Sequence, residues 1–232
     1  MAGASDPAAT KHLPLPHDAR SPEVLHSHLL ENHQARFAQI GAGRSIMTTK
    51  QGFESVNRAL LITGPPGVGK TTAIRRIAAS LPGWRLAGFY TEEIRVAGER
   101  KGFRALIFDG FEQIMAHLDV RGPHRVGKYG VKVSVIDQLA DSQLALNPTV
   151  DLYIVDEIGK MECYSQRFES AMRRLLNSRA LLVAAIARKG GGLIAEAKEM
   201  KGVELWEVTR ANRDELPDRA VAWLQAARAS NR

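Results

Sequence analysis

Residues 59–72 read Ala59-Leu60-Leu61-Ile62-Thr63-Gly64-Pro65-Pro66-Gly67-Val68-Gly69-Lys70-Thr71-Thr72, an apolar run that ends in a glycine-rich loop. The loop matches Gly-x-x-x-x-Gly-Lys-Thr, a pattern typical of a phosphate-binding loop (P-loop) between a strand and a helix. Its glycines permit backbone angles that turn successive amide N–H groups around phosphate oxygens. A helix that begins near Lys70 points the positive end of its dipole at the same anion. The segment therefore predicts binding of a nucleoside triphosphate.

Two residues of this loop have individual tasks at the triphosphate. Lys70 is expected to reach the β- and γ-phosphates and to act in catalysis, and the Thr71 hydroxyl is expected to ligate Mg²⁺. Mg²⁺ is thus the expected cofactor. The nucleotide-binding residues predicted here are Gly64, Pro65, Pro66, Gly67, Val68, Gly69, Lys70, Thr71 and Thr72.

The composition is that of one globular domain with an appendage. Apolar residues make up 44% of the 232 residues, which is enough to fill a core. Cys163 is the single cysteine, so no disulfide can form within the sequence, which fits a reducing cytosol. The sequence contains no run of 18 uncharged apolar residues, so no membrane span is predicted, and its first residues lack the apolar core of a secretory signal. We therefore expect a cytoplasmic protein with no membrane partner.

The charge balance is basic, because 32 Lys and Arg residues against 25 Asp and Glu residues give a net charge of +7. Residues 1–54 hold five basic and five acidic residues, so the excess lies in the chain that follows. A site for a polyanion such as a triphosphate explains this positive charge. Nucleic acid is a weaker explanation, because aromatic residues (6%) are not interleaved with the basic ones.

Two parts are predicted along the chain. Residues 1–56 form an N-terminal extension, in which a disordered tail rich in Ala and Pro precedes a helix over residues 22–40. Apolar residues recur on one face of that helix, so it can dock on the domain or pair with a second copy, and the oligomeric state stays open. Residues 57–228 are predicted to form a P-loop NTPase domain.

Strands and helices alternate in this domain, which favours an α/β fold with a mainly parallel sheet covered on both faces. A hairpin is inserted between residues 93 and 108, and residues 121–133 are expected to be irregular and basic. The predicted strands are 59–63, 86–91, 152–155, 181–187 and 204–208, and the predicted helices are 70–81, 136–146, 165–177, 193–200 and 214–227.

A second motif, Leu152-Tyr-Ile-Val-Asp156-Glu157, is an apolar strand that ends in two carboxylates. Asp156 is expected at the carboxyl end of its strand, the edge where open α/β sheets bind ligands, and there it can hold the Mg²⁺. Glu157 can accept a proton from the water that attacks the γ-phosphate. Alternatively, Glu157 caps a loop or pairs with Lys160.

The motifs belong to a longer series of blocks between Arg58 and Leu224. These are Gly64–Thr71, Gly88–Glu93 with Gly102-Phe103, Arg125–Val131, Asp156–Glu162, and Val208-Thr209 with Asn212–Leu216. In this combination the chain resembles the cancer-related nucleoside-triphosphatase family, whose thermophile members are small P-loop NTPases. The first fifty-odd residues are not part of the family pattern.

The resemblance implies a three-layer domain with a RecA-like core and an inserted hairpin. It also implies Mg²⁺-dependent hydrolysis of several nucleoside triphosphates, ATP and GTP among them, to diphosphate and phosphate. The second nucleotide-contacting segment that it implies consists of Leu152, Tyr153, Ile154, Val155, Asp156, Glu157, Ile158 and Gly159.

A cation that stabilises the transferring phosphoryl group is a further expected element of the site. Arg125, in the basic segment, is the predicted catalytic residue, and Arg188, at the end of a strand, is the alternative. Either residue can also be an ordinary surface cation.

The leading hypothesis is a phosphohydrolase that acts on nucleoside triphosphates through Lys70, Thr71, Asp156 and Glu157. One alternative is a kinase that transfers the γ-phosphate to a small molecule or an RNA end, with the hairpin Arg95–Arg104 as its lid. Another is a binding module that nucleotide switches, with the N-terminal helix as its contact.

Overall fold

The computed structural model describes residues 57–108 and 110–230. The predicted N-terminal extension, with its helix over residues 22–40, lies outside the described residues. The fold is therefore that of the predicted P-loop domain.

The described residues form one nine-stranded sheet with the order β5-β6-β4-β3-β2-β7-β8-β1-β9. Strands β2, β7, β8, β1 and β9 run parallel, and β3, β4, β6 and β5 extend the sheet from β2 as antiparallel strands. Strand β8 thus separates β1, which leads into the P-loop, from β7, which carries the second motif, as in RecA-like domains. The strands are β1 (Ala59–Thr63), β2 (Leu86–Val96), β3 (Glu99–Ile107), β4 (Glu112–His117), β5 (Arg125–Val126), β6 (Tyr129–Val131), β7 (Leu152–Ile158), β8 (Leu182–Ile186) and β9 (Val203–Glu207).

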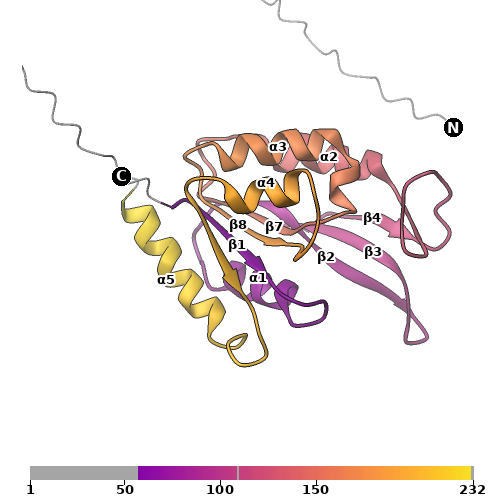
Figure 1. The fold of residues 1–232 in the computed structure, drawn as a ribbon, viewed down its shortest axis with the longest axis horizontal. Coiled ribbons are helices and arrows are strands. Elements are labelled where there is room, and N and C mark those ends of the chain that lie inside the picture. The colour runs from indigo at the N-terminus through magenta and orange to yellow at the C-terminus, as the bar shows by residue number, and fades with distance from the viewer. Residues whose placement is uncertain (1–56, 109, 231–232) are drawn as a thin grey trace, which may run out of the picture. The chain divides into compact units, whose positions relative to one another are not determined.

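Helices cover both faces of the sheet, as Figure 1 shows. One face carries α1 (Lys70–Ala79) and α5 (Leu216–Ala229), and the other carries α2 (Val133–Gln143), α3 (Gln166–Leu176) and α4 (Leu193–Glu199); a short 3₁₀ helix, η2 (Glu162–Tyr164), follows β7. No helix of the described residues has both the length and the apolar character needed to cross a membrane.

The apolar runs of the parallel strands follow from this layered arrangement. Successive side chains of a strand point to opposite faces, so Leu60 packs with the α1 and α5 side and Leu61 with the α2, α3 and α4 side. In β7, Ile154 and Val155 divide between the two faces in the same way. Strands buried on both faces are near-continuous apolar runs. The predicted three-layer α/β fold with a mainly parallel sheet is confirmed.

The antiparallel part of the sheet agrees only partly with the prediction. The inserted hairpin is present, with a turn at Ala97 and Gly98, whose φ angles are 50° and 82°. However, β2 is one continuous strand through residue 96, and β5 and β6 lie in the segment 121–133 that was expected to be irregular. Strand β4 was not predicted, because only Met115 and Ala116 of its six residues are fully buried. These strands exist through pairing with β3 and with each other, which local sequence does not reveal.

Candidate nucleotide-binding and catalytic site

The P-loop connects β1 to α1 and has the backbone that phosphate binding requires. Gly67 and Gly69 have φ angles of 73° and 114°, a region that residues with a Cβ avoid. A Cβ on Gly64 would lie 2.7 Å from the carbonyl oxygen of Val208, so only glycine allows this close approach to the chain after β9. The Lys70 ammonium donates to the Gly64 carbonyl oxygen at 3.3 Å and so curls over the loop. Helix α1 has no side-chain cap, so its first N–H groups remain for an anion.

Asp156 lies near the end of β7, and its side chain is only 2% exposed. Its Oδ2 accepts hydrogen bonds from the backbone N–H of Thr91 at 2.9 Å and from the Thr91 hydroxyl at 2.6 Å. Its Oδ1 is buried and accepts no hydrogen bond from a described residue. Burial raises the pKa of Asp156 to about 6, although Thr91 and the nearby Thr71 hydroxyl favour the charged form. A buried carboxylate oxygen without a partner is costly, so this atom is poised for a cation.

The pairing of β2 with β7 brings Thr91 to Asp156, from which it is 65 residues distant in the sequence. The two strands run parallel, with Gly88 opposite Ile154 and Phe89 opposite Val155. A Cβ on Gly88 would lie 1.9 Å from the Ile154 carbonyl oxygen, and Gly88 has a φ of 107°. Glycine at this position therefore allows the strand approach that positions the Asp156 carboxylate.

A cavity of about 540 Å³, here called the P-loop cavity, opens beside the loop. It brings together Lys70, Thr71 and Glu157, three of the residues predicted from the sequence. Its lining consists of Pro66, Gly67, Gly69, Lys70, Thr71, Thr72, Arg75, Thr91, Glu92, Glu93, Arg100, Phe103 and Glu157. Both carboxylates and cations line it, and Arg75 of α1 pairs with Glu92 of β2 at 2.9 Å.

A second cavity of about 470 Å³, here called the neighbouring cavity, shares four lining residues with the first. The shared residues are Thr91, Arg100, Phe103 and Glu157. Glu157 thus lies where the two spaces meet, close to the buried carboxylate of Asp156. A carboxylate at that place can accept a proton from a water molecule beside the P-loop.

Glu162 adds a third carboxyl group close to Asp156 and Glu157. Its side chain is 4% exposed, and its Oε2 would lie 3.1 Å from a Cβ on Gly159. Burial, together with the charges of Glu157 and Asp156, raises the pKa of Glu162 to about 8, so this group is largely neutral at neutral pH. Within the part of the chain that the structure describes, no group of three His, Cys, Asp or Glu side chains could hold a metal ion. A cation at Asp156 therefore needs further oxygens from substrate or water.

The second segment predicted to contact nucleotide divides into two parts. Its apolar side chains, at most 1% exposed, form part of the core beneath the helices and line neither the P-loop cavity nor the neighbouring cavity; they are Leu152, Tyr153, Ile154, Val155 and Ile158. Glu157 and Gly159 reach the cavity walls, and Asp156 contacts the wall residue Thr91. The apolar residues therefore position the carboxylates.

The two arginines considered from the sequence lie elsewhere. The Arg125 guanidinium donates to the Lys128 carbonyl oxygen at 2.6 Å, within the β5–β6 hairpin. Arg188 faces Glu207 at 3.6 Å. Neither arginine lines the P-loop cavity. A catalytic role for Arg125 stays a prediction.

Six lining residues of the P-loop cavity have no individual role in the sequence-based predictions, namely Arg75, Thr91, Glu92, Glu93, Arg100 and Phe103. Thr91 belongs to the Gly88–Glu93 block and Arg100 to the predicted hairpin, and these are the signals that could have drawn attention to them. Thr91 and Arg100 reach the site through the pairing of β2 with β7 and with β3, and Arg75 lies on α1 just after the P-loop, so no local motif assigns them a role.

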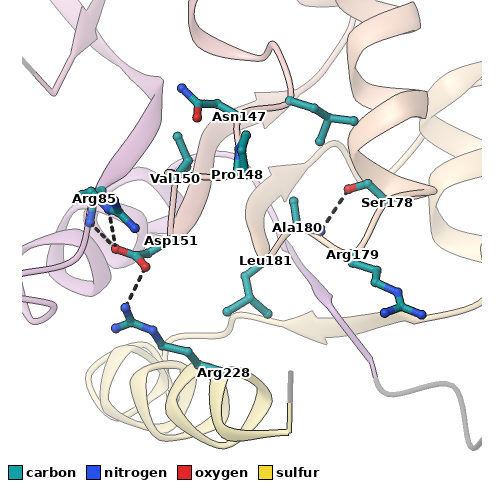
Figure 2. A pocket seen from close by; sticks show the side chains of 11 residues that line it. Arg85, Asn147, Pro148, Val150, Asp151, Ser178, Arg179, Ala180, Leu181 and Arg228 are labelled. Carbon is teal, nitrogen blue, oxygen red and sulfur yellow. Dashed lines mark hydrogen bonds and ion pairs between the residues drawn. The ribbon is translucent and has the colours of Figure 1, made fainter. Parts of the chain in front are cut away.

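A larger cavity, of about 710 Å³, lies at the opposite edge of the sheet, before the first residues of β2, β7 and β8 (Figure 2). Figure 2 shows Asp151 in its wall between Arg85 and Arg228. Asp151 accepts hydrogen bonds from the Arg85 backbone N–H at 2.9 Å and from the Arg228 guanidinium at 2.6 Å. These bonds connect the start of β7 to the end of α5. This cavity contains none of the residues predicted to bind nucleotide.

Known proteins share both the sequence pattern and the fold. A family model described as NTPase matches residues 59–221. The nucleoside-triphosphatase THEP1 of Thermotoga petrophila is 38% identical over 174 residues, which cover 74% of this chain and 96% of that protein. The cancer-related nucleoside-triphosphatase of Homo sapiens is 33% identical over 187 residues, which cover 74% of this chain and 98% of that protein.

Solved structures give the same result. The crystal structure of THEP1 from the hyperthermophile Aquifex aeolicus has a TM-score of 0.66 and 33% identity, over 72% of this chain and 99% of that one. The solution structure of a human cancer-related nucleoside triphosphatase has a TM-score of 0.64 and 34% identity, over 73% of this chain and 98% of that one.

Proposed function

The chain belongs to the NTPase family, and from this premise we propose that it is a Mg²⁺-dependent phosphohydrolase of nucleoside triphosphates. It converts a triphosphate and water to the diphosphate and phosphate. Relatives in this family are named nucleoside-triphosphatases, which supports the class of reaction.

The observation that carries the proposal is the Oδ1 atom of Asp156, which is buried without a hydrogen-bond partner beside the P-loop cavity. Asp156 and the Thr71 hydroxyl offer oxygen atoms, the ligands that Mg²⁺ prefers, and Mg²⁺ is commonly held by one or two carboxylates plus substrate phosphates. The residues therefore fit this cation. When bound, it would neutralise charge on the β- and γ-phosphates.

The chain's own residues supply the remaining functions. The N–H groups of the P-loop and the Lys70 ammonium bind the phosphates and oppose their charge. Thr91 holds the Asp156 carboxylate in one orientation through its two hydrogen bonds. Glu157 orients a water molecule in line with the γ-phosphorus and accepts its proton. The new bond joins the water oxygen to the γ-phosphorus, and the bond to the bridging oxygen breaks to release the diphosphate.

Broad base tolerance, with ATP and GTP both accepted, is the finer part of the proposal. The P-loop cavity offers glycine backbone, hydroxyl, ammonium, guanidinium and carboxylate groups. No side-chain amide, the group suited to reading the edge of adenine, is among its described lining residues. This lining supports recognition of phosphates over recognition of a particular base.

The test is phosphate release from ATP, GTP, CTP and UTP, with Mg²⁺ and with EDTA. We expect similar rates across the four bases and loss of activity in EDTA. Lys70→Ala should remove most activity, and Glu157→Gln should lower kcat by about 100-fold or more while nucleotide binding persists. Lys201→Ala and Glu199→Gln, two exposed positions away from the cavity, are the matched controls. Unchanged phosphate release by Glu157→Gln would refute the proposed role of this residue.

A kinase activity has one observation in its favour, namely the neighbouring cavity, which is large enough for a small acceptor molecule. The same assay separates the two functions. A hydrolase releases phosphate in buffer alone, whereas a kinase consumes ATP only when an acceptor is added. A nucleotide-switched module would bind nucleotide with negligible turnover.

A further inference from the structure

Arg100 occupies a special place beside the P-loop. Among the described residues, it is the cation that lines both the P-loop cavity and the neighbouring cavity, and it shares both linings with Glu157. Lys70 and Arg75 line only the first cavity, and Lys160 lines only the second. Arg100 therefore shares the lining of both spaces with Glu157, the residue proposed to orient the attacking water.

The stem and head of Arg100 are held by aromatic residues. Its Nε donates to the Tyr129 hydroxyl at 3.0 Å, and that hydroxyl donates to the Arg100 carbonyl oxygen at 3.3 Å. Its guanidinium carbon lies 5.2 Å from the centre of the Phe103 ring and 5.7 Å from that of Tyr129. Stacking on aromatic rings restricts a guanidinium without consuming its N–H donors. Arg100 is therefore a fixed cation with donors to spare.

The remaining contact of Arg100 is with an acidic residue of the P-loop cavity. Its Nη1 donates to Glu93 Oε1 at 2.7 Å, and Arg95 approaches the other oxygen of Glu93. The Glu93 carboxylate lines the cavity in which the triphosphate is expected. An incoming phosphate therefore meets a guanidinium that is already bound to an anion. The same phosphate is repelled by that anion, the Glu93 carboxylate.

We propose that Arg100 is the cation that contacts the transferring γ-phosphoryl group, and that Glu93 holds its guanidinium until nucleotide binds. This inference rests on the proposed hydrolase function. On binding, the γ-phosphate displaces the Glu93 carboxylate, while the Tyr129 bond and the two rings keep the guanidinium in place. The N–H groups of Arg100 then face the equatorial oxygens, where negative charge develops as the bond to the bridging oxygen breaks. Arg95 retains Glu93 after the exchange.

Two kinetic consequences distinguish this role from simple support of the hairpin. Arg100→Gln keeps the length of the stem and removes the charge, so kcat should fall by about 100- to 1,000-fold with little change in the affinity for ADP. Glu93→Gln removes the competing anion, so the KM for the triphosphate should fall several-fold. Lys101→Gln is the matched control, since Lys101 follows Arg100 in β3, pairs with Glu99 and lines neither cavity.

The deciding measurement is binding of Mg²⁺, ADP and aluminium fluoride, which together mimic the phosphoryl group in transfer, compared with binding of ADP alone. Wild-type protein and Lys101→Gln should bind ADP more tightly when Mg²⁺ and aluminium fluoride are present. Arg100→Gln should lose most of this gain in affinity but should still bind ADP. The assignment would be overturned if Arg100→Gln gained as much affinity as the wild-type protein does. It would also be overturned if Arg100→Gln lost binding of ADP alone to the same extent as binding of ADP with aluminium fluoride. An unchanged KM in Glu93→Gln would overturn the holding role of Glu93.

Two additional variants keep the test decisive. If Arg100→Gln does not fold, Arg100→Lys retains the charge and the stem but loses the planar donors, and full kcat in that variant would overturn the proposal. Tyr129→Phe removes only the hydroxyl that anchors Nε and should lower kcat less than Arg100→Gln does. Absence of phosphate release from the wild-type protein would instead refute the hydrolase function itself, so the two failures are distinguishable.

Discussion

Glu162→Gln is expected to abolish a loss of stability that the wild-type protein suffers as the pH rises. The Glu162 carboxyl has a pKa of about 8 because it is buried near Glu157 and Asp156, whereas its ordinary value is 4.5. At a pH between 4.5 and about 8, the Glu162 carboxyl has released its proton in the unfolded chain but retains it in the folded chain. The stabilising contribution is therefore complete below about pH 4.5, falls by about 1.4 kcal/mol per pH unit, and is lost once the pH passes about 8.

The expected magnitude is large enough to measure. From about pH 5 to about pH 8 the loss amounts to about 3 to 4 kcal/mol of unfolding free energy. Domains of this kind have a total of about 5 to 15 kcal/mol, so the effect is a considerable fraction. Glutamine has nearly the same shape as a protonated glutamate and cannot ionise. The variant should therefore gain stability relative to the wild-type protein as the pH rises.

The assay is urea unfolding followed by tryptophan fluorescence at several pH values between about 5 and 9. EDTA is present and nucleotide is absent, so that no cation or phosphate alters the carboxylates. The measured quantity is the unfolding free energy of the variant minus that of the wild-type protein, which cancels groups common to both. Glu199→Gln, at an exposed position, is the matched control. A difference for Glu162→Gln that does not change with pH would refute the reasoning, because Glu162 would then ionise alike in the folded and unfolded chain.

Three other substitutions probe the site and its support. Gly88→Ala places a Cβ 1.9 Å from a backbone carbonyl oxygen of β7 at a φ of 107°, so thermal unfolding should show a loss of about 3 kcal/mol or more, whereas Gly191→Ala, in open space, should change little. Thr91→Val removes the 2.6 Å hydrogen bond to Asp156, so the pKa of that carboxyl in the Mg²⁺-free protein should rise above about 6, which the pH dependence of its carboxyl NMR shift in EDTA would measure. Asp151→Asn weakens the bonds to two arginines at the far edge of the sheet and should cost about 1 to 3 kcal/mol in urea unfolding, with KM unchanged.

Local patterns predicted the parallel half of the fold well. Strands buried on both faces are near-continuous apolar runs, and in β1, β7 and β8 this signal is contained in four or five consecutive residues. Helix α3 lies within a residue of its predicted range at each end, and Ser165 caps it by accepting a hydrogen bond from the Phe168 N–H. In such elements the residues that determine the structure are neighbours in sequence.

The antiparallel half was predicted less well for a physical reason. Strand β4 has exposed or half-buried residues at four of its six positions, so its sequence resembles that of a loop. Its partner β3 satisfies its backbone groups, and that pairing is a property of the sheet. The two-residue strand β5 is likewise defined only by its partner β6.

The sequence by itself determined the chemistry of the P-loop, because the glycines, Lys70 and Thr71 lie within eight consecutive residues and a single strand–loop–helix unit suffices to orient them. It also placed a carboxylate pair at the end of a buried strand. The tertiary structure alone decided which groups complete the site. Thr91 reaches Asp156 only through the register of β2 against β7, and Arg100 reaches the wall beside Glu157 only because β3 folds back on β2. Burial likewise sets the proton affinity of Glu162, and burial is a property of the packed molecule that no short segment encodes.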